Sequence, residues 1–124
     1  MAKILVVDDE QDIVRGVVKI MESCGHQVTT ARDGAEALAM VGKSRPDLVI
    51  LDLNIPKIHG RDVCRTLRSD PKTRDLPIVM MTSSYISLED AGRSAEPGAD
   101  EYVVKPFLRE LLIHNVERLL ARAS

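Results

Sequence analysis

The sequence predicts an α/β domain built on one parallel β-sheet with helices on both faces. Short apolar runs alternate with segments whose apolar residues recur every three or four positions, which indicates five strand–helix pairs. Four of the five runs are continuously apolar, as expected of strands buried on both faces. A strict strand–helix order implies right-handed crossovers and therefore helices on both sides of the sheet. The 124 residues suit one domain of this kind.

Five segments are predicted as strands. The apolar runs that indicate buried strands are residues 4–7, 48–51, 78–81 and 102–104. Residues 28–31 are more polar, which is typical of an edge strand. Pro46 and Pro77 lie just before two of these strands, where a missing backbone N–H costs little.

Helices are predicted between and after these strands. Apolar residues at helical spacing run from Ile13 to Cys24, from Val63 to Leu67 and from Leu108 to Leu120. Pairs that resemble capping boxes precede two further helices, near 34–43 and near 87–95; these pairs are Asp33 with Glu36 and Ser87 with Asp90. Gly25 and Gly98 lie where helices should stop. Pro97 should end the fourth helix early, and that helix has the weakest apolar pattern.

The composition excludes several classes of function. Apolar residues make up 44% and charged residues 29%, which is ordinary for a globular protein. A formal charge of −2 provides no basic field for a phosphate backbone, so nucleic acid is not expected as a direct partner. The apolar runs are too short to insert in a membrane. The sequence therefore predicts a cytoplasmic protein with one domain over residues 1–124.

Reactive side chains follow four of the predicted strands. Asp8 and Asp9 follow the first strand, Asp52 ends the third, Thr82 ends the fourth and Lys105 follows the fifth. In open parallel sheets, ligands bind beyond the carboxyl ends of the strands, so these groups should share one site. Two carboxylates about 5 Å apart would repel by roughly 3 kcal/mol at an effective dielectric constant of 20. A divalent cation relieves this repulsion, and an all-oxygen ligand set favours Mg²⁺.

These groups suit phosphoryl transfer to a carboxylate. A carboxylate can act as the nucleophile, and Asp52 has the central place in the predicted array. Asp9, supported by Asp8, would hold the metal. Because the transition state spreads negative charge over the phosphoryl oxygens, Lys105 and the Thr82 hydroxyl would stabilise it.

Four motifs resemble one known family. They are Val6-Val-Asp-Asp9, Asp52-Leu-Asn-Ile-Pro56 followed by Gly60, Met81-Thr-Ser83, and Tyr102-Val-Val-Lys-Pro-Phe107. The chain resembles the receiver domains of bacterial two-component response regulators, and closely resembles the single-domain chemotaxis type. The likeness covers essentially all of residues 1–124. It implies a flavodoxin-like (βα)₅ fold with strand order 2-1-3-4-5.

The resemblance also implies roles for the motif residues. Asp52 would accept a phosphoryl group from a sensor histidine kinase or phosphotransfer protein, or from a small phosphodonor. Asp9, Asp52 and the backbone carbonyl of Asn54 would hold Mg²⁺, with Asp8 acting through water. On phosphorylation Thr82 would move toward the phosphoryl group, and Tyr102 would turn inward. The surface of the fourth helix, fifth strand and fifth helix would then change for a downstream protein or output domain.

Other interpretations remain open at this point. A Mg²⁺-dependent phosphohydrolase of the haloacid dehalogenase type would need an Asp two residues after the nucleophile, where this chain has Asn54. A nucleotide or flavin binder is disfavoured, because no Gly-rich phosphate loop follows the first strand. An interaction module that has lost the switch would be expected to lack part of the acidic pair, Asp52 or Lys105. The sequence favours a switch that promotes only its own phosphorylation and dephosphorylation, rather than a turnover enzyme.

Overall fold

A computed structural model describes residues 1–82 and 98–123 of the chain. The predicted helix near 87–95, its capping pair and its early end at Pro97 lie outside the described residues. The five strands are β1 (Lys3–Val7), β2 (Gln27–Ala31), β3 (Leu48–Asp52), β4 (Ile78–Thr82) and β5 (Glu101–Val104). The four described helices are α1 (Gln11–Ser23), α2 (Gly34–Lys43), α3 (Gly60–Ser69) and α5 (Arg109–Ala123).

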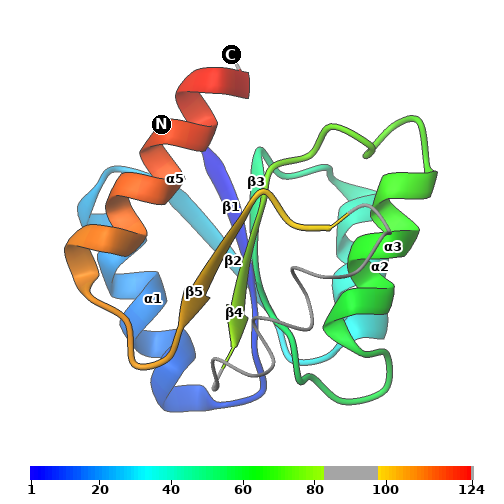
Figure 1. Cartoon of the computed structure of the whole chain (residues 1–124), viewed down its shortest axis with the longest axis horizontal. Coiled ribbons are helices and arrows are strands. Elements are labelled where there is room, and N and C mark those ends of the chain that lie inside the picture. The colour runs from blue at the N-terminus through cyan, green and yellow to red at the C-terminus, as the bar shows by residue number, and fades with distance from the viewer. Residues whose placement is uncertain (83–97, 124) are drawn as a thin grey trace.

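The five strands form one parallel sheet in the order β2-β1-β3-β4-β5. The predicted fold class and strand order are therefore confirmed. Figure 1 shows α1 and α5 on one side of the sheet and α2 and α3 on the other. Since all strands run in the same direction, their carboxyl ends lie along a single edge.

Two apolar cores lie on the two faces of the sheet, and alternate residues of each strand supply them. Ile4 and Val6 of β1 pack with α1 and α5, whereas Leu5 and Val7 pack with α2 and α3. All five residues of β3 are buried. This double burial explains why the central strands are continuously apolar rather than alternating.

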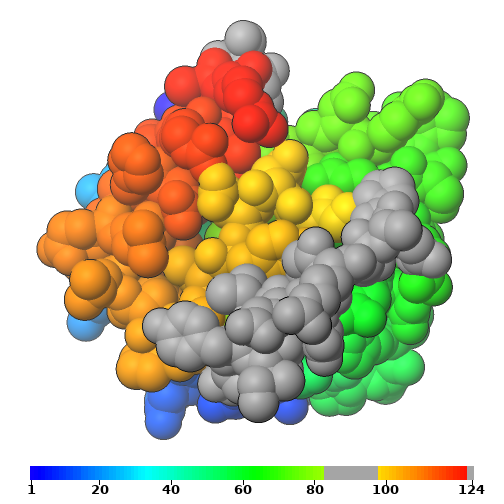
Figure 2. Space-filling model, in the orientation of Figure 1, coloured from blue at the N-terminus to red at the C-terminus, as the bar shows by residue number. Residues whose placement is uncertain are grey.

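The two edge strands differ from the central ones. In β2 only Ala31 is fully buried, which agrees with the polar edge strand predicted there. The expectation that residues 102–104 are buried on both faces is wrong, because only Val103 is fully buried in β5. The strand order explains this, since β5 is the last strand and pairs with β4 alone. Figure 2 shows the gold atoms of β5 reaching the surface beside the orange atoms of α5.

Two helix ends follow the predicted signals. Asp33 caps α2, and its side chain accepts a hydrogen bond of 2.8 Å from the backbone N–H of Glu36. Gly25 follows α1 with a φ of +88°, a conformation that glycine adopts readily. Within residues 1–82 and 98–123, every helix is too short or too polar to serve as a transmembrane span.

Candidate functional site

The fold brings four of the predicted reactive groups to the carboxyl edge of the sheet. Asp8 follows β1, Asp52 and Thr82 are the last residues of β3 and β4, and Lys105 follows β5. Backbone hydrogen bonds continue the strands to this point, including one of 2.7 Å from the Lys105 N–H to the Thr82 carbonyl. Asp8, Asp52 and Thr82 are all buried. Buried polar side chains at the ends of largely apolar central strands mark this edge as the candidate site.

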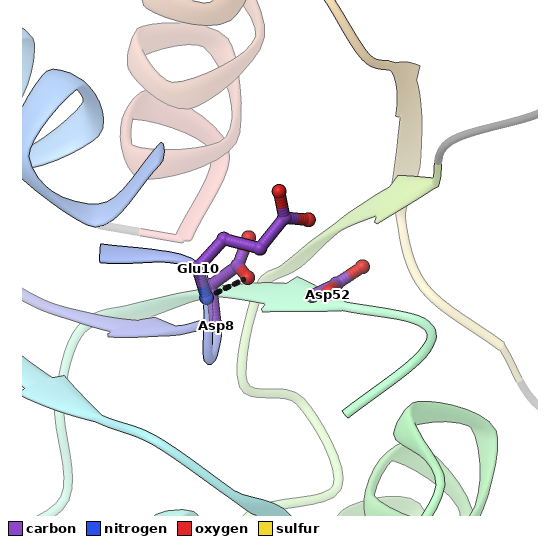
Figure 3. A group of neighbouring side chains, drawn as sticks. All are labelled: Asp8, Glu10 and Asp52. Atoms are coloured by element: carbon purple, nitrogen blue, oxygen red, sulfur yellow. Dashed lines mark hydrogen bonds between the residues drawn. The ribbon is translucent and has the colours of Figure 1, made fainter. Parts of the chain in front are cut away.

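Three carboxylates form the acidic part of the site (Figure 3). Asp8, Glu10 and Asp52 each place one oxygen within 4.8 Å of the other two. Asp8 and Asp52 are 0% and 3% exposed, so little solvent screens their mutual repulsion. The Oδ1 of Asp8 accepts a hydrogen bond of 3.0 Å from the backbone N–H of Glu10, which fixes the turn after β1.

The membership of this group differs from the predicted one. Asp9 is exposed, and its carboxylate is not among the three that converge. Glu10, which was not among the predicted site residues, takes part instead. The run of three acidic residues from 8 to 10 was the available signal, but it does not reveal which side chains face the sheet edge.

The ammonium group of Lys105 lies among the three carboxylates. Its Nζ is 2.8 Å from Asp8 Oδ2, 3.2 Å from Glu10 Oε1 and 3.4 Å from Asp52 Oδ2. The Lys105 side chain is only 9% exposed, and the Lys105–Pro106 peptide bond that follows is cis. One cation therefore balances part of the charge of three anions, and a net negative charge remains.

The charges of the site shift two pKa values. Burial, followed by the nearby Asp8 carboxylate, raises the pKa of Asp52 to about 6, although Lys105 opposes the shift. Burial alone would lower the pKa of Lys105. The hydrogen bond to Asp8 and the charges of Asp52 and Asp8 outweigh burial, so the pKa of Lys105 lies above its usual value. Ionisation of Asp52 is therefore less favourable in the folded protein than in water.

The donor set of the site fits a divalent cation. Its ligand atoms are carboxylate oxygens, which are the ligands that Mg²⁺ prefers. Burial is the main cause of the raised pKa of Asp52, and a second cation would relieve the repulsion from Asp8 that adds to it. Asn54 lies two residues after Asp52 in the loop that follows β3, and its backbone N–H donates a hydrogen bond of 3.4 Å to Asp52 Oδ1. The backbone of Asn54 therefore stays close to the nucleophile predicted from the sequence.

The two predicted switch residues lie on neighbouring strands. Thr82 is 1% exposed and pairs in register with Val104, while Tyr102 pairs with Met80. The half-buried Tyr102 packs against the core on the α2 and α3 side. Its hydroxyl accepts a hydrogen bond of 3.3 Å from the Ala99 N–H. This bond ties the β5 side chain to the segment that leads into the strand.

Comparison with known proteins gives the same family from sequence and from structure. The family model of the response regulator receiver domain matches residues 4–117. The response regulator MprA of a Mycobacterium species is 41% identical over 98% of this chain and 52% of its own length. The DNA-binding dual master transcriptional regulator RpaA of Synechocystis is 38% identical over 100% of this chain and 51% of its own length. The chain thus spans about half the length of these curated relatives.

Solved structures match over nearly the whole chain. The chemotaxis response regulator CheY4 of Vibrio cholerae has a TM-score of 0.85 and 33% identity, covering 96% of this chain and 98% of its own. The signal receiver domain of a signal transduction histidine kinase from Syntrophus aciditrophicus has a TM-score of 0.90 and 34% identity, covering 98% and 92%. With the strand order and the acidic sheet edge described above, these matches show that the chain belongs to the response regulator receiver domain family.

Proposed function

We propose that this chain is a phosphorylation-activated switch of a two-component pathway, with Asp52 as the phosphoacceptor. The observation that supports it best is the convergence of Asp8, Asp52 and Lys105 at one buried sheet edge. Asp8 and Lys105 both lie near the Asp52 carboxylate, and Asp52 ends the central strand β3. In this proposal residues 1–124 act together as one receiver unit, in the cytoplasm.

The covalent step forms one bond and breaks one bond. A carboxylate oxygen of Asp52 attacks the phosphorus of the donor, and the bond from phosphorus to the donor nitrogen or oxygen breaks. The leaving group keeps that electron pair. Lys105 Nζ is 3.4 Å from Asp52 Oδ2 and would donate a hydrogen bond to a phosphoryl oxygen, and Thr82 at the neighbouring strand end would donate its hydroxyl to another. Both groups stabilise charge on the equatorial oxygens.

The proposed cofactor is Mg²⁺. When bound, it would neutralise negative charge on the phosphoryl oxygens and on the carboxylates. Asp8 and Asp52 would hold it, together with the backbone carbonyl of Asn54. Since Mg²⁺ usually takes only one or two carboxylates and keeps several waters, these groups suffice.

The proposed partners follow from the family. A sensor histidine kinase or a phosphotransfer protein would supply the phosphoryl group to Asp52. A downstream protein or an output domain would read the change at β5 and α5. The chain would turn over no separate substrate, because the reacting carboxylate belongs to the protein and is regenerated only when water removes the phosphoryl group.

Intact-mass spectrometry tests the phosphoacceptor. After incubation with acetyl phosphate and Mg²⁺, the wild type should gain one phosphoryl group, and Asp52→Asn should gain none. Removal of Mg²⁺ with EDTA should abolish the adduct on the wild type. Asp62→Asn, which removes an exposed carboxylate on α3, should react like the wild type.

Two results would contradict the proposal. One is an adduct of equal amount on Asp52→Asn. The other is an unmodified wild type that binds Mg²⁺ but accepts no phosphoryl group from either acetyl phosphate or a phosphorylated histidine kinase. The second result would favour an interaction module that keeps the fold without the switch.

A further inference from the structure

Glu10 lies at a helix start, but its side chain does not cap the helix. It is the N-cap residue of α1, where short side chains such as Ser, Thr, Asp and Asn normally accept a backbone N–H. The Glu10 side chain makes no such capping hydrogen bond. Its Oε1 contacts Lys105 Nζ at 3.2 Å instead, across 95 positions of sequence. The N-terminus of α1 therefore has no side-chain cap from Glu10, and the Glu10 carboxylate faces the site instead.

The Glu10 carboxylate lies at the solvent side of the acidic group. Its side chain is 61% exposed, whereas those of Asp8 and Asp52 are 0% and 5% exposed. Figure 3 shows it beside Asp8, with Asp52 on the neighbouring strand. A ligand that approaches Asp52 from solvent therefore meets the charge of Glu10 as it enters.

We propose that Glu10 is a positioning residue that sets two properties of the site in opposite directions. It strengthens the binding of a divalent cation, and it slows the transfer of a phosphoryl group from a small anionic donor. This inference rests on the proposed function, in which Asp52 accepts the phosphoryl group.

Both effects follow from the contacts. The ammonium group of Lys105 has three N–H donors, and one of them donates a hydrogen bond to Glu10. Without Glu10, this N–H could donate to a phosphoryl oxygen instead. Glu10 also adds a negative charge whose oxygen lies within 4.8 Å of the oxygens of Asp8 and Asp52. That charge attracts Mg²⁺ and repels the phosphoryl oxygens of the donor.

The test compares Glu10→Gln with Asp12→Asn. Both substitutions remove one exposed carboxylate near the start of α1, but Asp12 pairs with Arg15 rather than with Lys105. Isothermal titration calorimetry gives the Kd for Mg²⁺ of each unphosphorylated protein. Quenched reactions with saturating Mg²⁺ and acetyl phosphate, followed by intact mass, give the rate of phosphorylation.

For Glu10→Gln we expect the Kd for Mg²⁺ to rise about threefold to tenfold and the phosphorylation rate to rise by a similar factor. Asp12→Asn should stay within about twofold of the wild type in both measurements. The differences should shrink in roughly 0.5 M KCl, because salt screens an exposed charge. A purely structural disturbance would instead weaken metal binding and slow phosphorylation together, and it would persist in salt.

Several results would overturn the inference. They are an unchanged Kd and rate in Glu10→Gln, a fall in its rate, or the same response from Asp12→Asn. A wild type that binds Mg²⁺ but accepts no phosphoryl group would contradict the proposed function itself. The Kd measurement would still decide the role of Glu10 in that case, since an unchanged Kd refutes it.

Discussion

Replacement of Asp52 by Asn is expected to stabilise the metal-free protein by about 3 kcal/mol at pH 7.5. The pKa of Asp52 rises from 3.8 to about 6, and a shift of about two units corresponds to roughly 3 kcal/mol between the two protonation states. Asparagine is close in shape and carries no charge, so it removes this cost. Lys105 keeps Asp8 and Glu10 as partners, and no buried charge is left alone. Urea denaturation in EDTA should show the gain in the free energy of unfolding. In thermal denaturation, the same gain should raise Tm by roughly 10 °C.

The effect should depend on pH with a definite sign. Folded Asp52 binds its proton more tightly than the unfolded chain does, so its contribution lowers stability as the pH rises from about 4 to about 6. Above about pH 7 the cost is fully present. The advantage of Asp52→Asn should therefore fall from about 3 kcal/mol at pH 7.5 to about 1 kcal/mol at pH 4.5.

Two controls test whether the gain in stability comes from the buried charge of Asp52 rather than from the loss of any carboxylate. Mg²⁺ should stabilise the wild type and narrow its difference from Asp52→Asn, because the ion binds the folded state with the carboxylate present. Asp62→Asn removes an exposed carboxylate that pairs with Arg65 and should change stability by less than about 0.5 kcal/mol at either pH. A variant at Asp52 that is no more stable than the wild type would refute a strained charge at this position.

The fold was predictable because its signals are local. Continuous apolar runs indicate strands buried on both faces, and residues such as Asp33 and Gly25 indicate where helices begin and end. The burial of β5, which was predicted wrongly, shows the limit of local signals. An apolar run of three residues can occur in a central strand or in an edge strand. Only the strand order decides how much of the run is buried.

The site was only partly predictable for a related reason. Asp8, Asp52 and Lys105 follow or end strands, so the parallel sheet brings them together wherever those strands are correctly assigned. Beyond the strand end, the backbone turns into α1, and the direction of each side chain depends on that turn. Glu10 joins the group and Asp9 does not, and the partner that Glu10 contacts is 95 residues away. The run of acidic residues 8–10 shows that carboxylates are present there, but not which of them faces the site.

Substitution of Gly60 by Ala should be among the most damaging changes near the site. A Cβ at this position would lie 2.5 Å from the backbone oxygen of Asp52 and 2.8 Å from two backbone atoms of Leu53. The Gly60 N–H also donates a hydrogen bond of 2.9 Å to the Leu53 carbonyl, so α3 is anchored at the end of β3. Backbone atoms cannot rotate away as a side chain can. We expect a loss of about 3 kcal/mol, together with a Kd for Mg²⁺ several-fold weaker, since the Asp52 backbone must move.

Gly16→Ala provides the matched control for this prediction, because it adds the same methyl group in open space. Gly16 lies inside α1, and a Cβ there would meet no atom within 4 Å. Alanine in a helix interior is favoured over glycine, so this variant should be about 0.5–1 kcal/mol more stable than the wild type. Urea denaturation of both variants, with Mg²⁺ titrations, tests the pair. If Gly60→Ala matched the wild type in stability and in Mg²⁺ affinity, the close approach of α3 to the end of β3 would not constrain Asp52. Opposite signs in the two variants would show that the contact with the Asp52 backbone, rather than the added methyl group, causes the loss.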